Sequence, residues 1–117
     1  MTRRPHLIAL AALATGALSL ATSPARAQDT VKVGVILPMT GPSASTGKQI
    51  EGAIKLWQQQ TGGKAGGKKI EVLIKDDAGV ADTTRRLAQE LVVNDKVVAL
   101  AGFGLTPLAL ATAPIAT

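Results

Sequence analysis

The chain has 117 residues, with 13 lysines and arginines, 8 acidic residues, 12 glycines and no cysteine. This length holds at most one small domain, because domains usually contain about 50–250 residues. The lack of cysteine excludes disulfide scaffolds, zinc ribbons, thiol catalysis and lipid attachment through an N-terminal cysteine.

Residues 1–27 have the pattern of an export signal. The pair Arg3-Arg4 precedes an apolar run over residues 7–21, and an Ala-Arg-Ala cleavage motif ends at Ala27. A membrane anchor is the alternative, but the run is shorter than the ~20 apolar residues of a spanning helix. We therefore expect cleavage after Ala27 and a periplasmic location, reached by ordinary secretion or by the twin-arginine route.

The charge left after the signal is small. Removing residues 1–27 takes away three arginines and no acidic residue, which leaves 10 basic and 8 acidic side chains and a net charge of +2. The basic residues are scattered and have almost no aromatic neighbours. Because nucleic-acid binding needs a dense basic face or base-stacking aromatics, no nucleic-acid partner is expected.

The mature sequence opens with a strand pattern followed by a helix pattern. Residues 31–37 form a short apolar run that ends at Pro38, which predicts a strand buried on both faces. Next, apolar residues recur at the spacing of one helix face, which predicts a helix from Gly47 to about Gln60. The pairs Gly62-Gly63 and Gly66-Gly67 are predicted to end it. The stripe consists of Ile50, Ala53, Ile54 and Trp57.

A second strand and helix follow. Residues 70–75 predict a strand, and residues 83–93 a helix with Leu87, Ala88, Leu91 and Val92 on one face. Asp82 is the predicted N-cap of this helix, and Asn94-Asp95 its end.

The last pair of elements starts with a strand over residues 97–102. A third helix is expected from Pro107, with Thr106 as N-cap and proline at the first helical position, and Pro114 is expected to kink or end it.

This alternation predicts the α/β class, as a three-layer, doubly wound parallel sheet with right-handed crossovers. Three strands and two aromatic residues make a small core for residues 28–117, and the sequence stops at Thr117 without a terminating signal. We therefore expect a fragment of a longer protein.

Two predicted loops suit ligand binding, since open parallel sheets bind ligands beyond the carboxyl ends of their strands. The loop over residues 38–47 is rich in hydroxyls, and the loop over residues 102–107 also delivers a hydroxyl to a helix start, where free amides and partial positive charge favour a carboxylate. The alternative is that these hydroxyls serve only as helix caps and contact no ligand. The candidate ligand-binding residues are Ser45, Thr46, Leu105 and Thr106.

Other chemistry finds little support. Asp76-Asp77 could be a metal or phospho-acceptor pair, but the only histidine, His6, lies in the signal, so a loop cap is the favoured role. No P-loop or Gly-x-Gly-x-x-Gly pattern follows a strand, and no nucleophile has a base. No catalytic residue, metal or cofactor is expected.

Three stretches of the sequence resemble one family. These are residues 33–42 followed by Gly47, residues 70–77, and residues 98–116, which include Thr106. They are similar to the leucine/isoleucine/valine-binding family, the periplasmic substrate-binding proteins of ABC transporters with the type I periplasmic-binding fold. The resemblance implies that residues 28–117 form the first part of an N-terminal lobe.

The family resemblance also implies roles. Two lobes close on a small amino acid or related carboxylate of the branched-chain type and deliver it to a membrane permease. Thr106 matches a hydroxyl residue that holds the ligand carboxylate, and Thr46 stands where an aromatic often covers the ligand. The alternatives are a sensor domain of the same fold and a secreted α/β enzyme with catalytic residues beyond Thr117.

Overall fold

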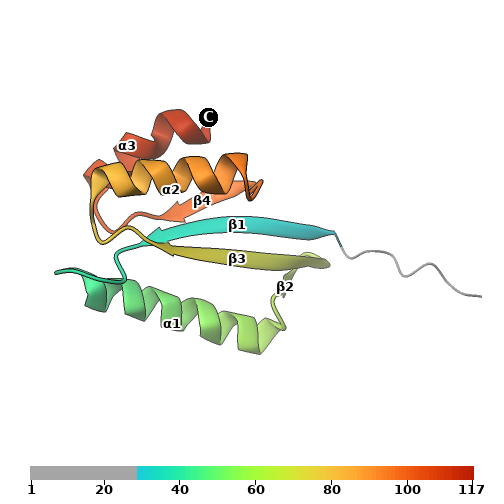
Figure 1. Ribbon diagram of the computed structural model, residues 1–117. Helices are drawn as coiled ribbons and strands as arrows, with labels where there is room; N and C mark the ends of the chain where they lie inside the picture. Colours follow the sequence, from blue (N-terminus) through green and yellow to red (C-terminus); the bar gives the residue numbers. More distant parts are fainter. Residues whose placement is uncertain (1–28) are drawn as a thin grey trace, which may run out of the picture.

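The computed structural model describes residues 29–117, so the predicted signal, its cleavage site after Ala27 and Gln28 lie outside the described residues (Figure 1). The elements follow in the order β1 (Thr30–Leu37), α1 (Ala44–Thr61), β2 (Lys64–Ala65), β3 (Lys68–Asp76), α2 (Ala81–Val93), β4 (Ala99–Gly102) and α3 (Thr106–Ala116). None of these described helices is long and apolar enough to cross a membrane.

The strands form one sheet in the order β2-β3-β1-β4. The central strand β1 is parallel to both neighbours, with Leu37 opposite Asp76 of β3 and Ile36 opposite Gly102 of β4. This register brings the carboxyl ends of the three strands to the same edge of the sheet.

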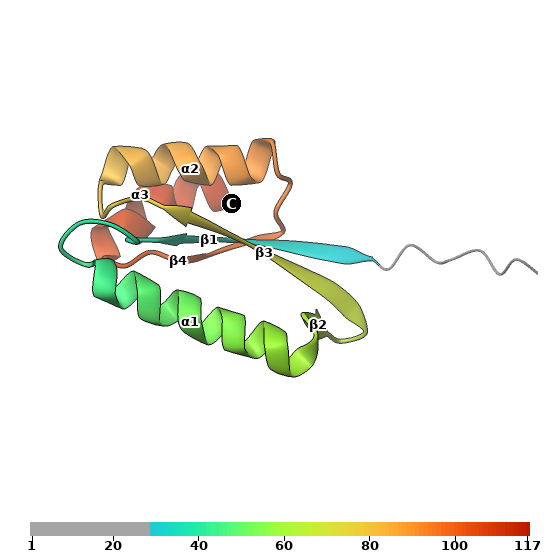
Figure 2. The ribbon, with the colours of Figure 1, turned by 60° about the horizontal axis from the view of Figure 1, so that its bottom comes forward.

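Helices cover both faces of the sheet, as Figure 2 shows. Helix α1 lies on one face, whereas α2 and α3 lie together on the other. The predicted three-layer, doubly wound α/β fold is therefore confirmed.

The core lies between the sheet and α2. Ile36 of β1 is fully buried against the α2 residues Leu87, Ala88 and Leu91, three of the four predicted for the inner face of this helix. Gly34 leaves room for them, because a Cβ there would lie 2.8 Å from a methyl carbon of Leu91. Burial is most complete on this side of the sheet.

The α1 side is packed more loosely. The predicted apolar stripe of α1 does face the sheet, but a cavity of about 440 Å³ that is open to solvent lies between parts of the two. Ile54 and Trp57 are half-buried, and Ile50 remains exposed. Together with Val33, Val35, Ala53, Ile70, Val72, Ala101 and Gly102 they line this cavity.

The β2–β3 hairpin was not predicted. Strand β2 runs antiparallel to β3, with Ala65 opposite Lys68, so the sheet is mixed at this edge. Gly66 and Gly67 have φ of +55° and +76°, the positive values that a two-residue hairpin turn needs. These two glycines turn the chain into β3 and also separate β3 from α1. Strand β2 has only two residues, too few to show a hydrophobic alternation in the sequence.

The predicted cap of α2 is wrong. The helix begins at Ala81, one residue before Asp82, and the N-cap position falls on Val80. The Thr84 amide donates to the Val80 carbonyl, so Asp82 is not needed as an acceptor and pairs with Arg85 instead.

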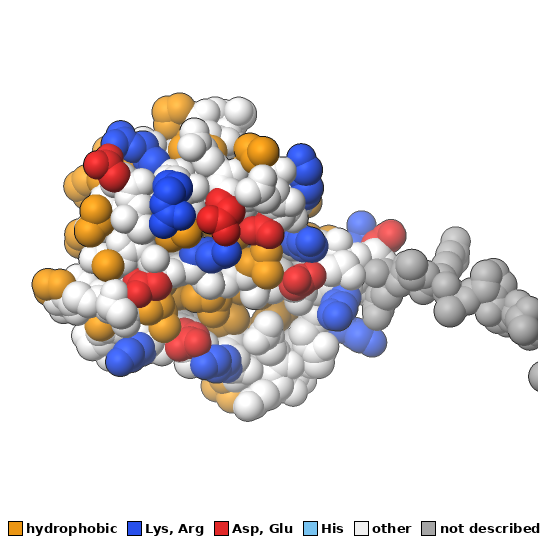
Figure 3. Space-filling model, in the orientation of Figure 1, with side chains coloured by type: hydrophobic (Ala, Val, Ile, Leu, Met, Phe, Trp, Pro, Cys, Tyr) orange, Lys and Arg blue, Asp and Glu red, His pale blue; other side chains and the backbone are white. Residues whose placement is uncertain are grey.

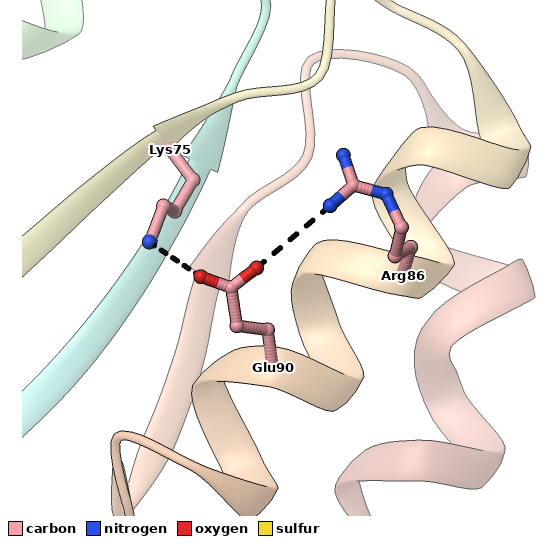
Figure 4. Close-up of polar contacts among 3 residues, drawn as sticks. All are labelled: Lys75, Arg86 and Glu90. Atoms are coloured by element: carbon pink, nitrogen blue, oxygen red, sulfur yellow. Dashed lines mark hydrogen bonds and ion pairs between the residues drawn. The ribbon is translucent and has the colours of Figure 1, made fainter.

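An ion pair joins α2 to β3 (Figure 4). Lys75 Nζ lies 2.8 Å from Glu90 Oε1, and Arg86 approaches the other carboxylate oxygen at 3.8 Å. The hydrogen bond raises the pKa of Lys75 and lowers the pKa of Glu90. Both side chains are about one-third exposed, so solvent screens the pair and its contribution to stability is small.

Charges elsewhere are mixed. On the face in Figure 3, basic and acidic side chains are interspersed and do not gather by sign. This distribution agrees with the small net charge of residues 28–117 and offers no dense basic face on this side for nucleic acid.

Candidate functional site

The candidate site is the carboxyl edge of the sheet between β1 and β4. The helices that follow these two adjacent strands, α1 and α3, lie on opposite faces (Figure 2). The connections therefore separate at this point, which is where open α/β sheets form a ligand crevice.

Pro38 lies at the centre of this edge. A Cβ on Gly47 of α1 would lie 2.2 Å from the Pro38 carbonyl oxygen, and a Cβ on Gly104 would lie 2.6 Å from the Pro38 ring. Both approaches are closer than a side chain permits, so only glycine fits. The start of α1 and the loop after β4 are therefore held against the same residue.

Asp76, at the end of β3, binds the loop after β1. Its Oδ1 accepts hydrogen bonds from the amides of Met39 at 2.8 Å, Thr40 at 3.3 Å and Ala78 at 2.9 Å. Its Oδ2 accepts a hydrogen bond of 2.7 Å from the Thr40 hydroxyl. Hydrogen bonds from the Ala78 amide and the Thr40 hydroxyl, followed by those from Met39 N and Thr40 N, hold the pKa of this carboxyl below its ordinary value.

This lowered pKa predicts a pH dependence of stability. A carboxyl with a lower pKa in the folded state stabilises the fold above its unfolded pKa, and that contribution disappears as the pH falls through the folded value. Asp76→Asn should therefore lower the melting temperature of the full-length protein near neutral pH. The difference from wild type should shrink between about pH 5 and pH 3 in thermal melts. A difference that stays constant over this range would contradict the prediction.

Asp77 has a separate structural role. It is fully buried, and its two oxygens accept hydrogen bonds from the Gly79 amide at 2.9 Å and the Thr84 hydroxyl at 2.7 Å. Asp77 thus fixes the start of α2, while Asp76 fixes the loop after β1. This geometry supports the loop-cap interpretation of the pair, and no group of three potential metal ligands occurs among residues 29–117.

Thr106 is not the N-cap that we predicted. The N-cap position is Leu105, whose backbone is extended, and α3 begins at Thr106. The amides of Leu108 and Ala109 both donate to the Leu105 carbonyl, so they leave the Thr106 hydroxyl no amide to cap. Thr106 is exposed and its hydroxyl makes no hydrogen bond to another described residue, so the hydroxyl is available at the positive end of the helix.

Ser45 and Thr46 belong to a helix and not to the loop in which we predicted them. Helix α1 begins at Ala44, three residues before the predicted start, so both residues lie in its first turn and are exposed. The carbonyl of Ser43 accepts the amides of Thr46 and Gly47, whereas the Ser45 amide has no acceptor within the described part of the chain. This helix start therefore also offers free polar groups.

The four predicted site residues lie in two groups on either side of Pro38. Ser45 and Thr46 directly precede Gly47, while Leu105 and Thr106 directly follow Gly104. Sequence reasoning did not assign Asp76 to the site, although its place at the end of β3 was the available signal. These loops meet at the edge of the sheet where open α/β sheets bind ligands, and both helix starts offer unpaired amides to that edge.

The fold has the architecture of one α/β lobe, and comparison identifies its family. Residues 30–117 match the model of the periplasmic binding protein family, and the chain belongs to that family. The predicted family is thereby confirmed. It is a family of binding proteins and not of enzymes, so the enzyme alternative is not supported.

A curated relative and several solved structures are similar to this chain. The Leu/Ile/Val-binding protein homolog 6 of Brucella abortus (strain 2308) is 47% identical over 110 residues, covering 92% of this chain and 27% of the relative. The chain thus spans about a quarter of the length of the relatives it matches.

Three solved structures differ in the ligand that they name. A solute-binding protein of an ABC transporter from Rhodopseudomonas palustris BisB5, in complex with 3,4-dihydroxybenzoic acid, is 64% identical, with a TM-score of 0.74 over 77% of this chain and 25% of its own. A second solute-binding protein from R. palustris, in complex with 4-hydroxybenzoate, is 41% identical, with a TM-score of 0.69 over 74% of this chain and 24% of its own. A leucine-binding protein from Thermotoga maritima MSB8 is 29% identical, with a TM-score of 0.68 over 74% of this chain and 24% of its own.

Proposed function

We propose that residues 28–117 form the first part of the N-terminal lobe of an ABC transporter solute-binding protein, and that its ligand is a small aromatic carboxylate of the hydroxybenzoate class. The observation that carries this proposal is the pair of helix starts beside Pro38, each with an exposed hydroxyl and a free amide. Such groups suit a carboxylate and the hydroxyl substituents of a small ring.

Each predicted residue has a part in this proposal. The Thr106 hydroxyl and amide donate to the carboxylate at the positive end of α3. Leu105, which is 47% exposed, offers an apolar surface for the ring. Ser45 and Thr46 supply hydroxyls for the ring substituents, and Thr46 occupies the position where the family resemblance implies an aromatic side chain.

A branched-chain amino acid is the second candidate, and the name of the Brucella relative favours it. An amino acid brings an ammonium group, which a carboxylate acceptor would best satisfy. Asp76 and Asp77, at the carboxyl end of β3, already accept hydrogen bonds from backbone amides and threonine hydroxyls. The aromatic acid is preferred because it makes no such demand, and because the 64% and 41% identical structures name hydroxybenzoates.

The proposal includes export and delivery. Cleavage after Ala27 would release the mature protein into the periplasm, where it hands the ligand to an ABC permease in the membrane. N-terminal sequencing of exported protein should begin at Gln28, and an intact Met1 would contradict cleavage. A membrane span later in the reading frame would favour the sensor alternative.

Calorimetric titration of the full-length protein tests the ligand. We expect 3,4-dihydroxybenzoate and 4-hydroxybenzoate to bind at least about tenfold more tightly than L-leucine, a difference of ~1.4 kcal/mol. 4-Methylphenol, which has a similar ring but no carboxylate, is the matched control and should not bind appreciably. Tighter binding of leucine would support the second candidate, and failure of all three acids would overturn both.

A further inference from the structure

We propose that Asp76 is a positioning residue for the ligand crevice: it holds the loop after β1 in the shape that presents the start of α1 to the ligand. This inference rests on the proposed function. Asp76 lies at the end of β3, two strands away from the crevice partner β4, and acts through the loop over residues 38–43.

The contacts to this loop are concentrated on one carboxylate. Among residues 29–117, the only side-chain hydrogen bonds to the loop are those of Asp76 with Met39 N, Thr40 N and Thr40 Oγ1. The same carboxylate accepts the Ala78 amide, so it ties the loop after β1 to the loop after β3. Without it, residues 39–43 would have no side-chain hydrogen bond to the rest of the described lobe.

Backbone packing supports the same arrangement. Gly41 has a φ of +78°, and a Cβ at this position would lie 3.3 Å from the Ala78 carbonyl oxygen. The loop therefore packs against Ala78, the residue whose amide donates a hydrogen bond to Asp76. The loop begins at Pro38, which lies against Gly104. It is followed by Ala44, the first residue of α1, whose amide donates a hydrogen bond to the Gly41 carbonyl. A shift of the loop would consequently move the start of α1 relative to α3.

Two threonines allow a matched experiment. Thr40 and Thr84 each donate a hydrogen bond of 2.7 Å to one of two consecutive aspartates, Asp76 and Asp77. Thr→Val removes the same hydroxyl in both cases, but only Thr40 belongs to the loop. Thr84 is buried on α2 and serves as the structural control.

The test measures affinity and loop protection in the full-length protein. Asp76→Ala should weaken binding of 4-hydroxybenzoate about tenfold or more in calorimetric titration, and Thr40→Val should weaken it by a smaller factor. Thr40→Ser, which keeps the hydroxyl, should restore wild-type affinity. Thr84→Val should lower the melting temperature but leave affinity within about twofold, because the loop keeps its hydrogen bonds.

A double variant separates positioning from direct contact. If Thr40 acts through Asp76, adding Thr40→Val to Asp76→Ala should cause little further loss of affinity. Full additivity would mean that Thr40 acts independently of Asp76 and would overturn the proposal. Unchanged affinity in Asp76→Ala would overturn it as well.

Hydrogen exchange keeps this inference separate from the proposed function. In ligand-free protein, Asp76→Ala should accelerate amide exchange over residues 39–46, whereas Thr84→Val should not. If the wild-type protein binds none of the benzoates or leucine, the proposed function fails, and this exchange pattern alone decides whether Asp76 holds the loop. Equal exchange in wild type and Asp76→Ala would then overturn the inference.

Discussion

Leu91→Ala should lower the free energy of unfolding of the full-length protein by about 2–5 kcal/mol. Leu91 is fully buried on α2 and belongs to the core cluster with Ile36, Leu87 and Ala88. It also fills the space over Gly34, where no side chain from β1 can replace it. Truncation therefore removes apolar contacts and leaves a cavity that its neighbours only partly fill.

Denaturant unfolding measures this loss, and Val93→Ala on the same helix is the control. Val93 is 59% exposed, so its truncation should change stability by no more than about 0.5 kcal/mol. Similar effects from the two variants would contradict the assignment of the core to this side of the sheet. Ligand affinity of folded Leu91→Ala should remain close to that of wild type, since Leu91 lies on the helix after β3 and not at the crevice edge.

Thr106→Val should weaken binding of the carboxylate ligand by about 1–3 kcal/mol, roughly tenfold or more. The hydroxyl stands at the first residue of α3 and donates to no described residue. In the proposed function it donates to the ligand carboxylate, so its loss would leave a carboxylate oxygen unpaired. Because Thr106 is not the N-cap of α3, we expect the melting temperature to change little.

Calorimetric titration and thermal melts on the same variant separate the two possible roles. Thr61→Val is the matched control, because Thr61 ends α1 and its hydroxyl donates to the Trp57 carbonyl at 2.8 Å, far along the helix from the site. It should leave affinity unchanged. A lowered melting temperature with unchanged affinity in Thr106→Val would exclude the ligand role.

The sequence predicted those elements whose apolar residues repeat over several positions. The apolar run of β1 and the stripe of α2 are set by the requirement to bury apolar side chains, and both elements occur in the structure. Strand β1 is buried only from Gly34 to Leu37, however, and not over its whole length. Strand β2 has two residues, too few for a period. The caps of α2 and α3 were wrong because helix starts depend on which carbonyl accepts the first amides. Here that carbonyl belongs to Val80 and Leu105, which have no capping side chain.

The edge of the sheet that carries the candidate site was predictable, since parallel strands bring their following loops together. The role of Asp76 was not predictable in the same way. Its partners, Met39 and Thr40, lie 37 and 36 residues earlier in the chain. They meet Asp76 only because the register of β1 and β3 aligns Leu37 with it. Such a contact depends on tertiary pairing and has no local sequence signature.

Pro38 packs against two glycines, and this packing fixes the backbone at the candidate site, whereas the exposed side chains around it can be replaced. Gly47 and Gly104 admit no side chain, so backbone packing against Pro38 limits the spacing of the two helix starts, together with the hydrogen bonds of Asp76 to the loop after β1. Ser45, Thr46 and Leu105 are exposed and carry none of that packing. Substitutions of these three side chains should therefore leave the backbone contacts that hold the two helix starts unchanged. If the proposed function holds, these three positions are the ones to randomise in order to change the ligand specificity of the lobe.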